Sequence, residues 1–283
     1  MQVFREKGPL IQAVQKVKSD GKRVGLVPTM GALHEGHLSL VENALKESDQ
    51  VVVSIFVNPT QFDNPDDLEK YPRNLERDLM LLENKVADIW IFSPSANELY
   101  GNSISSESFD FGGLESVMEG KFRNGHFDGV GTVVKHLFET VQPDKAFFGE
   151  KDFQQLQIVR KLIEKTGLPV EIIGCPILRE DSGLARSSRN ERLSDQNRKK
   201  AAFIYKTLKD AKHLFGTESA DYVVNWVENR FQNHSDFKLE YFEIADSKTL
   251  EKINKKEKGK QYRAFIAVYA DDIRLIDNIA LDN

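Results

Sequence analysis

Residues 27–37 read VPTMGALHEGH and join a short apolar run, residues 24–27, to an amphipathic run, residues 38–46. The first run has the composition of a buried strand, and the second has the apolar spacing that is typical of a helix. A helix N-terminus carries free amide groups and the positive end of a dipole, and glycines in the preceding turn let the backbone approach a ligand closely. This segment therefore predicts an anion-binding turn between a strand and a helix.

The alternation of strands and helices continues along the chain. Strand-like runs at residues 51–57 and 87–92 enclose a helical run at residues 75–84. After a Ser-, Gly- and Glu-rich stretch, residues 100–118, the order helix, strand, helix, strand follows at residues 130–141, 145–148, 153–165 and 170–173. Such alternation predicts an α/β domain with a parallel, doubly wound sheet. We expect this domain to span residues 1–176.

The pattern changes in the last third of the chain. Long helical runs at residues 196–215 and 220–232 precede strand-like runs at residues 239–244, 262–269 and 273–276. Helices followed by neighbouring strands indicate an antiparallel sheet and a smaller α+β domain. We assign residues 177–283 to it.

Length and composition limit the classes of protein that the chain can belong to. At 283 residues with 40% hydrophobic residues, the chain can form two domains with cores of their own. Lys and Arg total 39 against 44 Asp and Glu, and the net charge of -5 predicts neither nucleic acid nor an anionic membrane as a partner. Cys175 is the only cysteine, which excludes an intramolecular disulfide and suits the cytoplasm.

His34 and His37 are three residues apart at the start of the predicted helix, so both lie on one helix face. Imidazole groups there can donate hydrogen bonds to phosphate oxygens. In the plainer alternative, one histidine caps the helix and the other packs in the core. A zinc site is a third reading, but no further ligand follows at a fixed offset.

A second polar group follows the strand at residues 51–57, where Asn58 and Gln61 offer neutral amides. A neutral partner suits a nucleophilic carboxylate, because a close cation would weaken its attack. An ordinary Asn-Pro turn with an exposed Gln is the alternative. The loop at residues 63–73 contains four acidic residues and is long enough to be a lid, and Asp78 beyond it is a candidate Mg²⁺ ligand.

Three further blocks carry polar side chains that suit a binding site. Residues 123–131 combine Arg123 and His126 with small residues before a helix and are candidates to line a substrate pocket. Residues 148–155 place Lys151 where it can reach a phosphate, with Gln155 one turn further on the same side. Residues 184–193 read LARSSRNERL, in which hydroxyl and guanidinium groups form a phosphate clamp or, alternatively, a surface loop.

Together these blocks resemble the pantoate-β-alanine ligase (pantothenate synthetase) family. The likeness covers almost the whole first domain and extends into the second. It is carried by PTMG and HEGH at residues 28–31 and 34–37, Asn58 with Gln61, GEKD at residues 149–152 with Gln155, and SSRN at residues 187–190. The histidine and Ser-Ser-Arg blocks also look like the two ATP signatures of class I aminoacyl-tRNA synthetases.

The resemblance implies a Rossmann-like sheet of the class I synthetase and nucleotidyltransferase type, with the smaller domain closing over the ATP site. It implies ATP-dependent condensation of (R)-pantoate with β-alanine through a pantoyl adenylate, giving pantothenate for coenzyme A, together with AMP and pyrophosphate. It also implies Mg²⁺, a cytoplasmic location and a homodimer.

The resemblance further implies a role for individual residues. His37 is the expected proton donor, and His34, Lys151 and Arg189 act with it on the developing charge. Gln61 and Gln155 hold pantoate, and β-alanine enters beside Gln61 with Asn58 nearby. The residues expected to bind ATP are Met30, Gly31, Ala32, Leu33, His34, Glu35, Gly36, His37, Gly149, Glu150, Lys151, Asp152, Leu178, Arg186, Ser187, Ser188 and Arg189.

One residue departs from the family pattern. Arg186 stands where the resemblance leads us to expect an aliphatic Leu or Met against the nucleotide. An arginine can stack its plane on adenine or extend to a phosphate, so the departure bears on adenine affinity.

Three other functions use parts of the same pattern. A nucleotidyltransferase shares the histidine block but returns a dinucleotide-like product in place of AMP. A tRNA-charging enzyme releases AMP only with tRNA, and the acidic balance and short second domain disfavour it. A nucleotide sensor binds ATP without turnover.

Overall fold

The computed structural model describes residues 1–63, 65–86, 88–232, 234–253 and 255–281. Over these residues the chain divides into two compact units. The first comprises Met1–Glu150 and Gln154–Pro176, and the second comprises Lys151–Phe153 and the chain from Ile177 onward. The sequence-based division places residues 151–153 with the first domain, whereas their contacts assign them to the second unit. Ala87, at the start of one predicted strand, and residues 282–283 lie outside the described residues.

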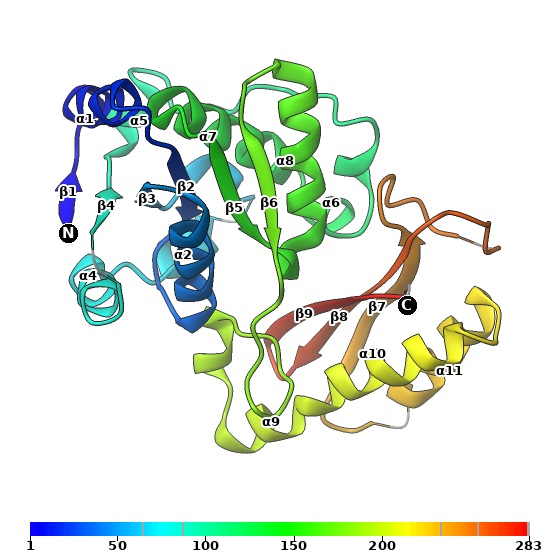
Figure 1. The fold of residues 1–283 in the computed structure, drawn as a ribbon. Helices are drawn as coiled ribbons and strands as arrows, with labels where there is room; N and C mark the ends of the chain where they lie inside the picture. The colour runs from blue at the N-terminus through cyan, green and yellow to red at the C-terminus, as the bar shows by residue number, and fades with distance from the viewer. Residues whose placement is uncertain (64, 87, 233, 254, 282–283) are drawn as a thin grey trace. The chain divides into compact units, whose positions relative to one another are not determined.

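The first unit is built on a parallel sheet, shown in Figure 1. In the described part of the chain it has six strands in the order β1-β4-β3-β2-β5-β6. Their bounds are β1 Gln2–Phe4, β2 Val24–Thr29, β3 Gln50–Ile55, β4 Ile89–Phe92, β5 Lys145–Gly149 and β6 Glu171–Cys175. The predicted doubly wound parallel sheet is confirmed. Sequence reasoning missed β1, which is only three residues long and lies at the sheet edge.

Helices cover both faces of this sheet (Figure 1). On one face, α2 (Glu35–Glu47) and α4 (Leu75–Glu83) pack through apolar residues onto alternate residues of β2, β3 and β4. On the other, α1 (Lys7–Ser19) and α7 (His126–Val141) contact each other and β2. The next helix, α8 (Phe153–Thr166), places Leu156 over Gly174 of β6, so close that a Cβ at residue 174 would lie 2.9 Å from it.

Short helical turns occupy the connections. They are α3 (Pro65–Lys70), α5 (Ala96–Tyr100), α6 (Glu119–Phe122), η1 (Pro59–Gln61), η2 (Leu114–Ser116) and η3 (Glu150–Asp152). The prediction of an irregular loop at residues 63–73 was wrong over α3. A proline at the first helical position, followed by two aspartates, is a helix start signal that explains this turn. Residue 64 of the predicted lid lies outside the described residues, and its action as a lid stays a prediction.

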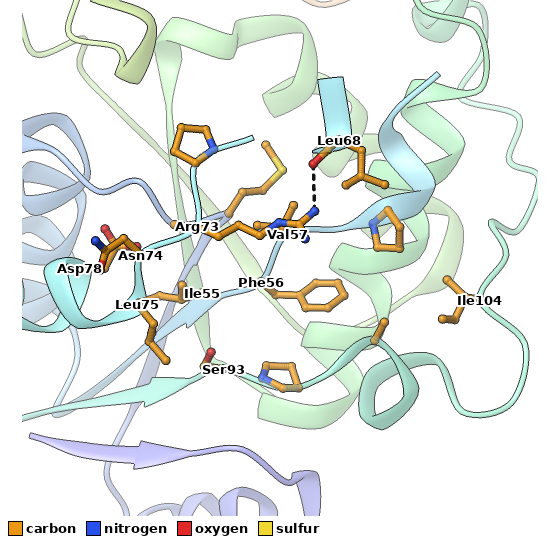
Figure 2. A pocket seen from close by; sticks show the side chains of 16 residues that line it. Ile55, Phe56, Val57, Leu68, Arg73, Asn74, Leu75, Asp78, Ser93 and Ile104 are labelled. Carbon is orange, nitrogen blue, oxygen red and sulfur yellow. Dashed lines mark hydrogen bonds between the residues drawn. The ribbon is translucent and has the colours of Figure 1, made fainter. Parts of the chain in front are cut away.

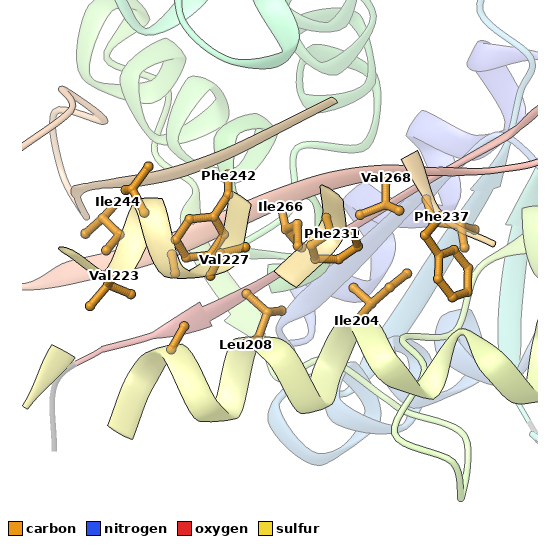
Figure 3. Close-up of a cluster of buried hydrophobic side chains, with 14 of the residues drawn as sticks. Ile204, Leu208, Val223, Val227, Phe231, Phe237, Phe242, Ile244, Ile266 and Val268 are labelled. Atoms are coloured by element: carbon orange, nitrogen blue, oxygen red, sulfur yellow. The ribbon is translucent and has the colours of Figure 1, made fainter. Parts of the chain in front are cut away.

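The second unit packs helices against one face of an antiparallel sheet. Its elements are η4 (Ser188–Arg192), α9 (Asp195–Lys200), α10 (Ala202–Phe215), α11 (Ala220–Gln232), β7 (Lys238–Asp246), β8 (Tyr262–Ala270) and β9 (Ile273–Ala280). The strand order is β7-β8-β9. Figure 3 shows the core, in which Leu208 and Val227 from the helices face Phe242 and Ile266 from the sheet. The predicted α+β arrangement is confirmed, although the helix predicted at residues 196–215 is divided at Ala201.

A glycine joins α7 to the turn that follows β3. The helix begins at His126, four residues before the predicted start, so Gly129 lies inside it. A Cβ at Gly129 would lie 2.4 Å from the carbonyl oxygen of Thr60 and 2.7 Å from Cα of Gln61. The carbonyl of Gly129 also accepts a hydrogen bond of 3.1 Å from Nδ2 of Asn58. Only a residue without a side chain allows the helix backbone this close to the η1 turn.

We expect Gly129→Ala to destabilise the protein by about 1–3 kcal/mol, because overpacking against backbone outweighs the gain in helix propensity. The measurement is the free energy of unfolding in urea. Gly8→Ala in α1 is the control, since apart from its chain neighbours nothing lies within 4 Å of its added Cβ. The control should be neutral or more stable by up to about 1 kcal/mol. Equal effects of the two substitutions would contradict the close-packing argument.

Candidate active site

The two histidines of the HEGH block cap α2 together. His34 is the N-cap, and its Nδ1 accepts a hydrogen bond of 3.0 Å from the backbone N–H of Gly36. Nδ1 of His37 accepts one of 3.3 Å from the backbone N–H of His34, and the ring centroids are 4.2 Å apart. A ring that accepts at Nδ1 carries its proton on Nε2. We infer that both imidazoles are neutral and offer Nε2–H donors at a helix N-terminus, where an anion is favoured.

A buried carboxylate holds the turn before these histidines. Asp78 of α4 accepts hydrogen bonds of 3.0 and 2.8 Å from the backbone N–H groups of Ala32 and Leu33. Gly31 and Ala32 have φ values of 81° and 51°, in the left-handed region. Asp78 is 2% exposed. Burial raises the pKa of its carboxyl group, and the two backbone hydrogen bonds oppose the rise.

These bonds bear on the prediction that Asp78 binds Mg²⁺. Each carboxylate oxygen already accepts a backbone N–H group, which leaves fewer lone pairs for a cation. Among the described residues, no group of three or more His, Cys, Asp or Glu side chains is arranged to hold a metal ion. The observed contacts give Asp78 a role in holding the turn, and metal binding by Asp78 stays a prediction.

The polar residues after β3 form a buried cluster around Gln61. Asn58 is 1% exposed and Gln61 6% exposed, so the alternative of an exposed Gln was wrong. Nδ2 of Asn58 donates to Oε1 of Gln61 at 3.2 Å, and Nε2 of Gln61 contacts Sδ of Met30 at 2.9 Å. The Tyr100 hydroxyl donates to Oδ1 of Asn58 at 2.5 Å. Asn58 thus fixes the orientation of Gln61.

His126 supports the same turn from α7. Its Nδ1 lies 2.8 Å from the carbonyl oxygen of Gln61, and the residue is 6% exposed. Arg123 precedes the helix, where its carbonyl accepts a hydrogen bond from the backbone N–H of His126. The Nδ1 contact places His126 beside the backbone of Gln61. Direct substrate contact by either residue stays a prediction.

The two glutamines at the start of α8 differ in burial and in their contacts. Gln154 is 5% exposed. Its Nε2 donates to the carbonyls of Leu114 and Val117 at 2.8 Å, and its Oε1 accepts from the N–H of Glu119 at 3.0 Å. Gln154 therefore holds the segment before α6. Gln155, which the sequence singled out, is half-buried and not engaged in this way.

The second unit carries the remaining predicted ATP residues on a small hairpin. An antiparallel bridge pairs Arg179 with Ala185, and the N–H of Arg186 donates to the carbonyl of Leu178 at 2.9 Å. Leu178 and Arg186 are therefore neighbours, as their shared predicted role requires. Ser187 then caps η4, since its Oγ accepts from the N–H of Arg189 at 3.3 Å.

Glu180 organises this hairpin and was missed by sequence reasoning. Its carboxylate accepts a hydrogen bond of 2.7 Å from Nη2 of Arg198 and one of 3.0 Å from Nδ2 of Asn190. Burial pushes the pKa of Glu180 upward, but the bonds from Arg198 and Asn190 outweigh it, and the pKa is lowered overall. Nδ2 of Asn190 also donates to the carbonyl of Ala185 at 3.0 Å, which ties η4 to the hairpin.

Figure 2 shows a cavity of the first unit that the sequence did not reveal. Its volume is about 610 Å³. The lining residues come from the turn after β2, the carboxyl ends of β3 and β4, and the start of α4, and include Met30, Gly31, Val57, Arg73, Asp78 and Ser93. His34, His37 and Gln61 are not among them. The cavity therefore touches the predicted ATP segment only at residues 30–31.

Cys175 at the end of β6 is not a nucleophile. It is 1% exposed. Burial, with the nearby carboxylates of Glu47 and Glu150, raises the pKa of its thiol to about 11. The thiol stays neutral near pH 7 and offers no thiolate for a covalent intermediate.

Strands β2 and β5 are adjacent, and the chain leaves them in opposite directions, toward β3 and toward β6. Ligands of such sheets bind outside the carboxyl ends of the strands at this point. The capped N-terminus of α2 follows β2, and Gly149 ends β5. Fold and site together define a nucleotide-binding α/β protein.

Comparison with known proteins places the chain within this class. It belongs to the pantoate-β-alanine ligase family, whose model matches residues 2–280. The pantothenate synthetase of Christiangramia forsetii is 80% identical over the full length of both chains. The crystal structure of pantothenate synthetase from Thermus thermophilus is similar with a TM-score of 0.90, at 39% identity and full coverage of both chains.

A further solved structure is that of the pantoate-β-alanine ligase from Francisella tularensis. It is similar with a TM-score of 0.79 at 32% identity, covering 100% of this chain and 98% of that chain. That protein is described as a complex with β,γ-ATP and β-alanine. The predicted family and fold are confirmed.

We expect Asp78→Ala to destabilise the protein by about 1–3 kcal/mol, because two buried backbone N–H groups lose their acceptor. Amide hydrogen exchange, followed by NMR, should show faster exchange at Ala32 and Leu33 than elsewhere in the turn. Glu76→Ala, an exposed residue of the same helix, is the control. Unchanged protection at both amides in Asp78→Ala would contradict the role of this carboxylate.

Proposed function

We propose that this chain is an ATP-dependent ligase that condenses (R)-pantoate with β-alanine, forming pantothenate, AMP and pyrophosphate. The observation that carries the proposal is the pair His34 and His37 at the N-terminus of α2, whose Nδ1 atoms accept backbone N–H groups; we infer from this that each ring carries its proton on Nε2. This pair lies in a chain that matches the family over residues 2–280. The bound nucleotide and β-alanine of the Francisella tularensis relative support the same substrate classes.

In the first step, a pantoate carboxylate oxygen attacks the α-phosphorus of ATP. The new bond joins that oxygen to phosphorus, and the bond to the bridging oxygen of pyrophosphate breaks. Negative charge grows on the phosphoryl oxygens as this happens. Neutral Nε2–H groups of His34 and His37 stabilise that charge by donating hydrogen bonds and need not surrender a proton. This refines the expectation that His37 acts as an acid.

Cationic and hydroxyl side chains of the second unit are further candidates to bind the phosphates of ATP. Lys151, Ser187, Ser188 and Arg189 are assigned to the ATP phosphates, with Leu178 and Arg186 toward the adenine. The hairpin geometry brings residues 178 and 186 together, which supports the shared assignment of Leu178 and Arg186. Charge-assisted hydrogen bonds of this kind are the strongest that a protein can offer a phosphate.

In the second step, the neutral amine of β-alanine attacks the acyl carbon of pantoyl adenylate. The C–N bond forms, the bond to the AMP oxygen breaks, and the amine releases a proton to solvent. AMP is a good leaving group, so positioning of the two reactants is the main requirement. Gln61 and Gln155 are assigned to pantoate and Gln61 to β-alanine. Asn58 orients the side chain of Gln61, and His126 holds its backbone carbonyl.

Three further parts of the proposal concern the ion, the assembly and the compartment. Mg²⁺ is included as the ion that accompanies ATP, and no step is assigned to it through a protein ligand. A homodimer and a cytoplasmic location are carried over from the family resemblance. Among the described residues, no helix is long and apolar enough to cross a membrane.

The test is release of AMP and pyrophosphate from Mg·ATP, with pantothenate followed by mass spectrometry. AMP and pantothenate are expected together only when pantoate and β-alanine are both present. A nucleotidyltransferase would instead return an adenylylated product without AMP, and a nucleotide sensor would bind ATP without turnover. Either result with correctly folded protein would refute the ligase.

We expect His37→Ala to slow adenylate formation by on the order of a hundredfold, because a donor to the developing charge is lost. Single-turnover formation of AMP from ATP and pantoate, chased with β-alanine, measures this step. His213→Ala removes an exposed histidine of α10 and is the control. An adenylation rate that matches the wild type would remove His37 from the mechanism.

A further inference from the structure

Two consecutive buried residues of β9 contact both ATP-binding segments of the second unit. Asp277 is 5% exposed and Asn278 2% exposed. Polar side chains this deeply buried in a sheet require partners. Their side chains point to opposite faces of the strand, because successive residues of a strand alternate. Each face receives a different segment.

Asp277 holds the hairpin that carries Leu178 and Arg186. Its carboxylate accepts two hydrogen bonds from the guanidinium of Arg179, at 2.6 and 2.9 Å. Arg179 also donates to the carbonyl of Gly183 at 3.0 Å, and its guanidinium stacks on the ring of Tyr205 at 3.6 Å. A bidentate pair fixes both the distance and the plane of the guanidinium. The hairpin is thereby fastened to β9 at one orientation.

Asn278 holds the segment that carries Lys151. Its Nδ2 donates a hydrogen bond of 2.9 Å to the carbonyl of Lys151, and its Oδ1 accepts one of 2.5 Å from Nη1 of Arg263. The two partners determine the orientation of the amide, since a carbonyl needs a donor and a guanidinium needs an acceptor. Arg263 in turn stacks on Phe153 at 3.8 Å. Residues 151–153 are therefore held at both ends.

We propose that Asp277 and Asn278 are positioning residues for ATP, which set the Lys151 segment and the hairpin that carries Leu178 and Arg186 relative to each other across β9. The inference rests on the proposed function, because it takes Lys151 and the hairpin as parts of the ATP site. Neither residue needs to touch the nucleotide. A displacement of about 1 Å at a binding group can reduce binding or rate severalfold to a hundredfold.

The test uses Asn278→Asp and Asn278→Leu in the full chain. Asn278→Asp keeps the size and the acceptor for Arg263 but loses the donor to the Lys151 carbonyl, so folding is expected to persist. Asn278→Leu removes both bonds without adding charge. We expect both variants to bind Mg·ATP about tenfold more weakly in isothermal titration calorimetry, with KM for pantoate and β-alanine unchanged.

Glu240→Gln is the matched control. Glu240 of β7 pairs with Arg274 of β9 at 2.6 Å and lies 3.3 Å from the hydroxyl of Tyr269, and all three residues are outside the two ATP segments in sequence. It should lower the thermal midpoint without changing the affinity for Mg·ATP. Asp277→Asn is the second test, of the hairpin side, and should also weaken Mg·ATP binding.

Several outcomes would overturn the proposal. Unchanged Mg·ATP affinity in folded Asn278→Asp or Asn278→Leu would do so, as would equal loss of affinity in Glu240→Gln. If Asn278→Asp binds Mg·ATP more weakly and Asn278→Leu does not, the added charge explains the loss, which would contradict a positioning role. If the wild type binds Mg·ATP but makes no pantothenate, the proposed function fails while the positioning test by calorimetry stands on its own.

Discussion

Strands β2 and β5 lie side by side in parallel, with Leu26 opposite Ala146, so their carboxyl ends reach the same edge of the sheet. The chain turns away from this pair on both sides, which in sheets of this kind leaves the space outside the pair to a ligand. The segments that follow the two strands can therefore approach one ligand. The pairing needs a small residue, because a Cβ at Gly25 would lie 2.5 Å from Oγ of Ser48 and 3.3 Å from the Phe147 ring. Close packing of these strands is thus the condition for the site.

The histidine pair shows how one set of atoms serves both folding and chemistry. The Nδ1 atoms of His34 and His37 satisfy backbone N–H groups at the start of α2, which a serine or aspartate usually does. That use fixes the tautomer and leaves Nε2–H as the donor. A neutral donor stabilises charge in a transition state without binding the phosphates of the ground state as strongly as a cation would. The capping role therefore explains why histidine is suited to this position.

The sequence predicts what depends on local periodicity and on motif chemistry. Alternating strands and helices predict the sheet, and the HEGH block is visible because glycine and histidine follow a strand. Contacts distant in sequence were missed for a physical reason. Asp78 reaches the turn at residues 32–33 across more than forty residues, and Asn278 reaches Lys151 across more than a hundred. No periodicity encodes such pairs, since each depends on the completed packing. The sequence placed Gly129 in a substrate loop. Its importance comes from the missing side chain, which lets the η1 turn approach the helix, and no sequence pattern shows this.

Arg186 is the residue at which the chain departs from the family pattern, and its surroundings reduce the difference. Its Nη1 lies 3.9 Å from Oε1 of Glu180, the carboxylate that also receives Arg198. A guanidinium beside a carboxylate presents less charge to a ligand than an isolated one. Its methylene stem can cover apolar surface while the head group turns toward the carboxylate. The stem is also the part that resembles an aliphatic residue in shape. As long as Glu180 is ionised, as its lowered pKa favours, Arg186 can offer the nucleotide an apolar surface similar to that of an aliphatic residue.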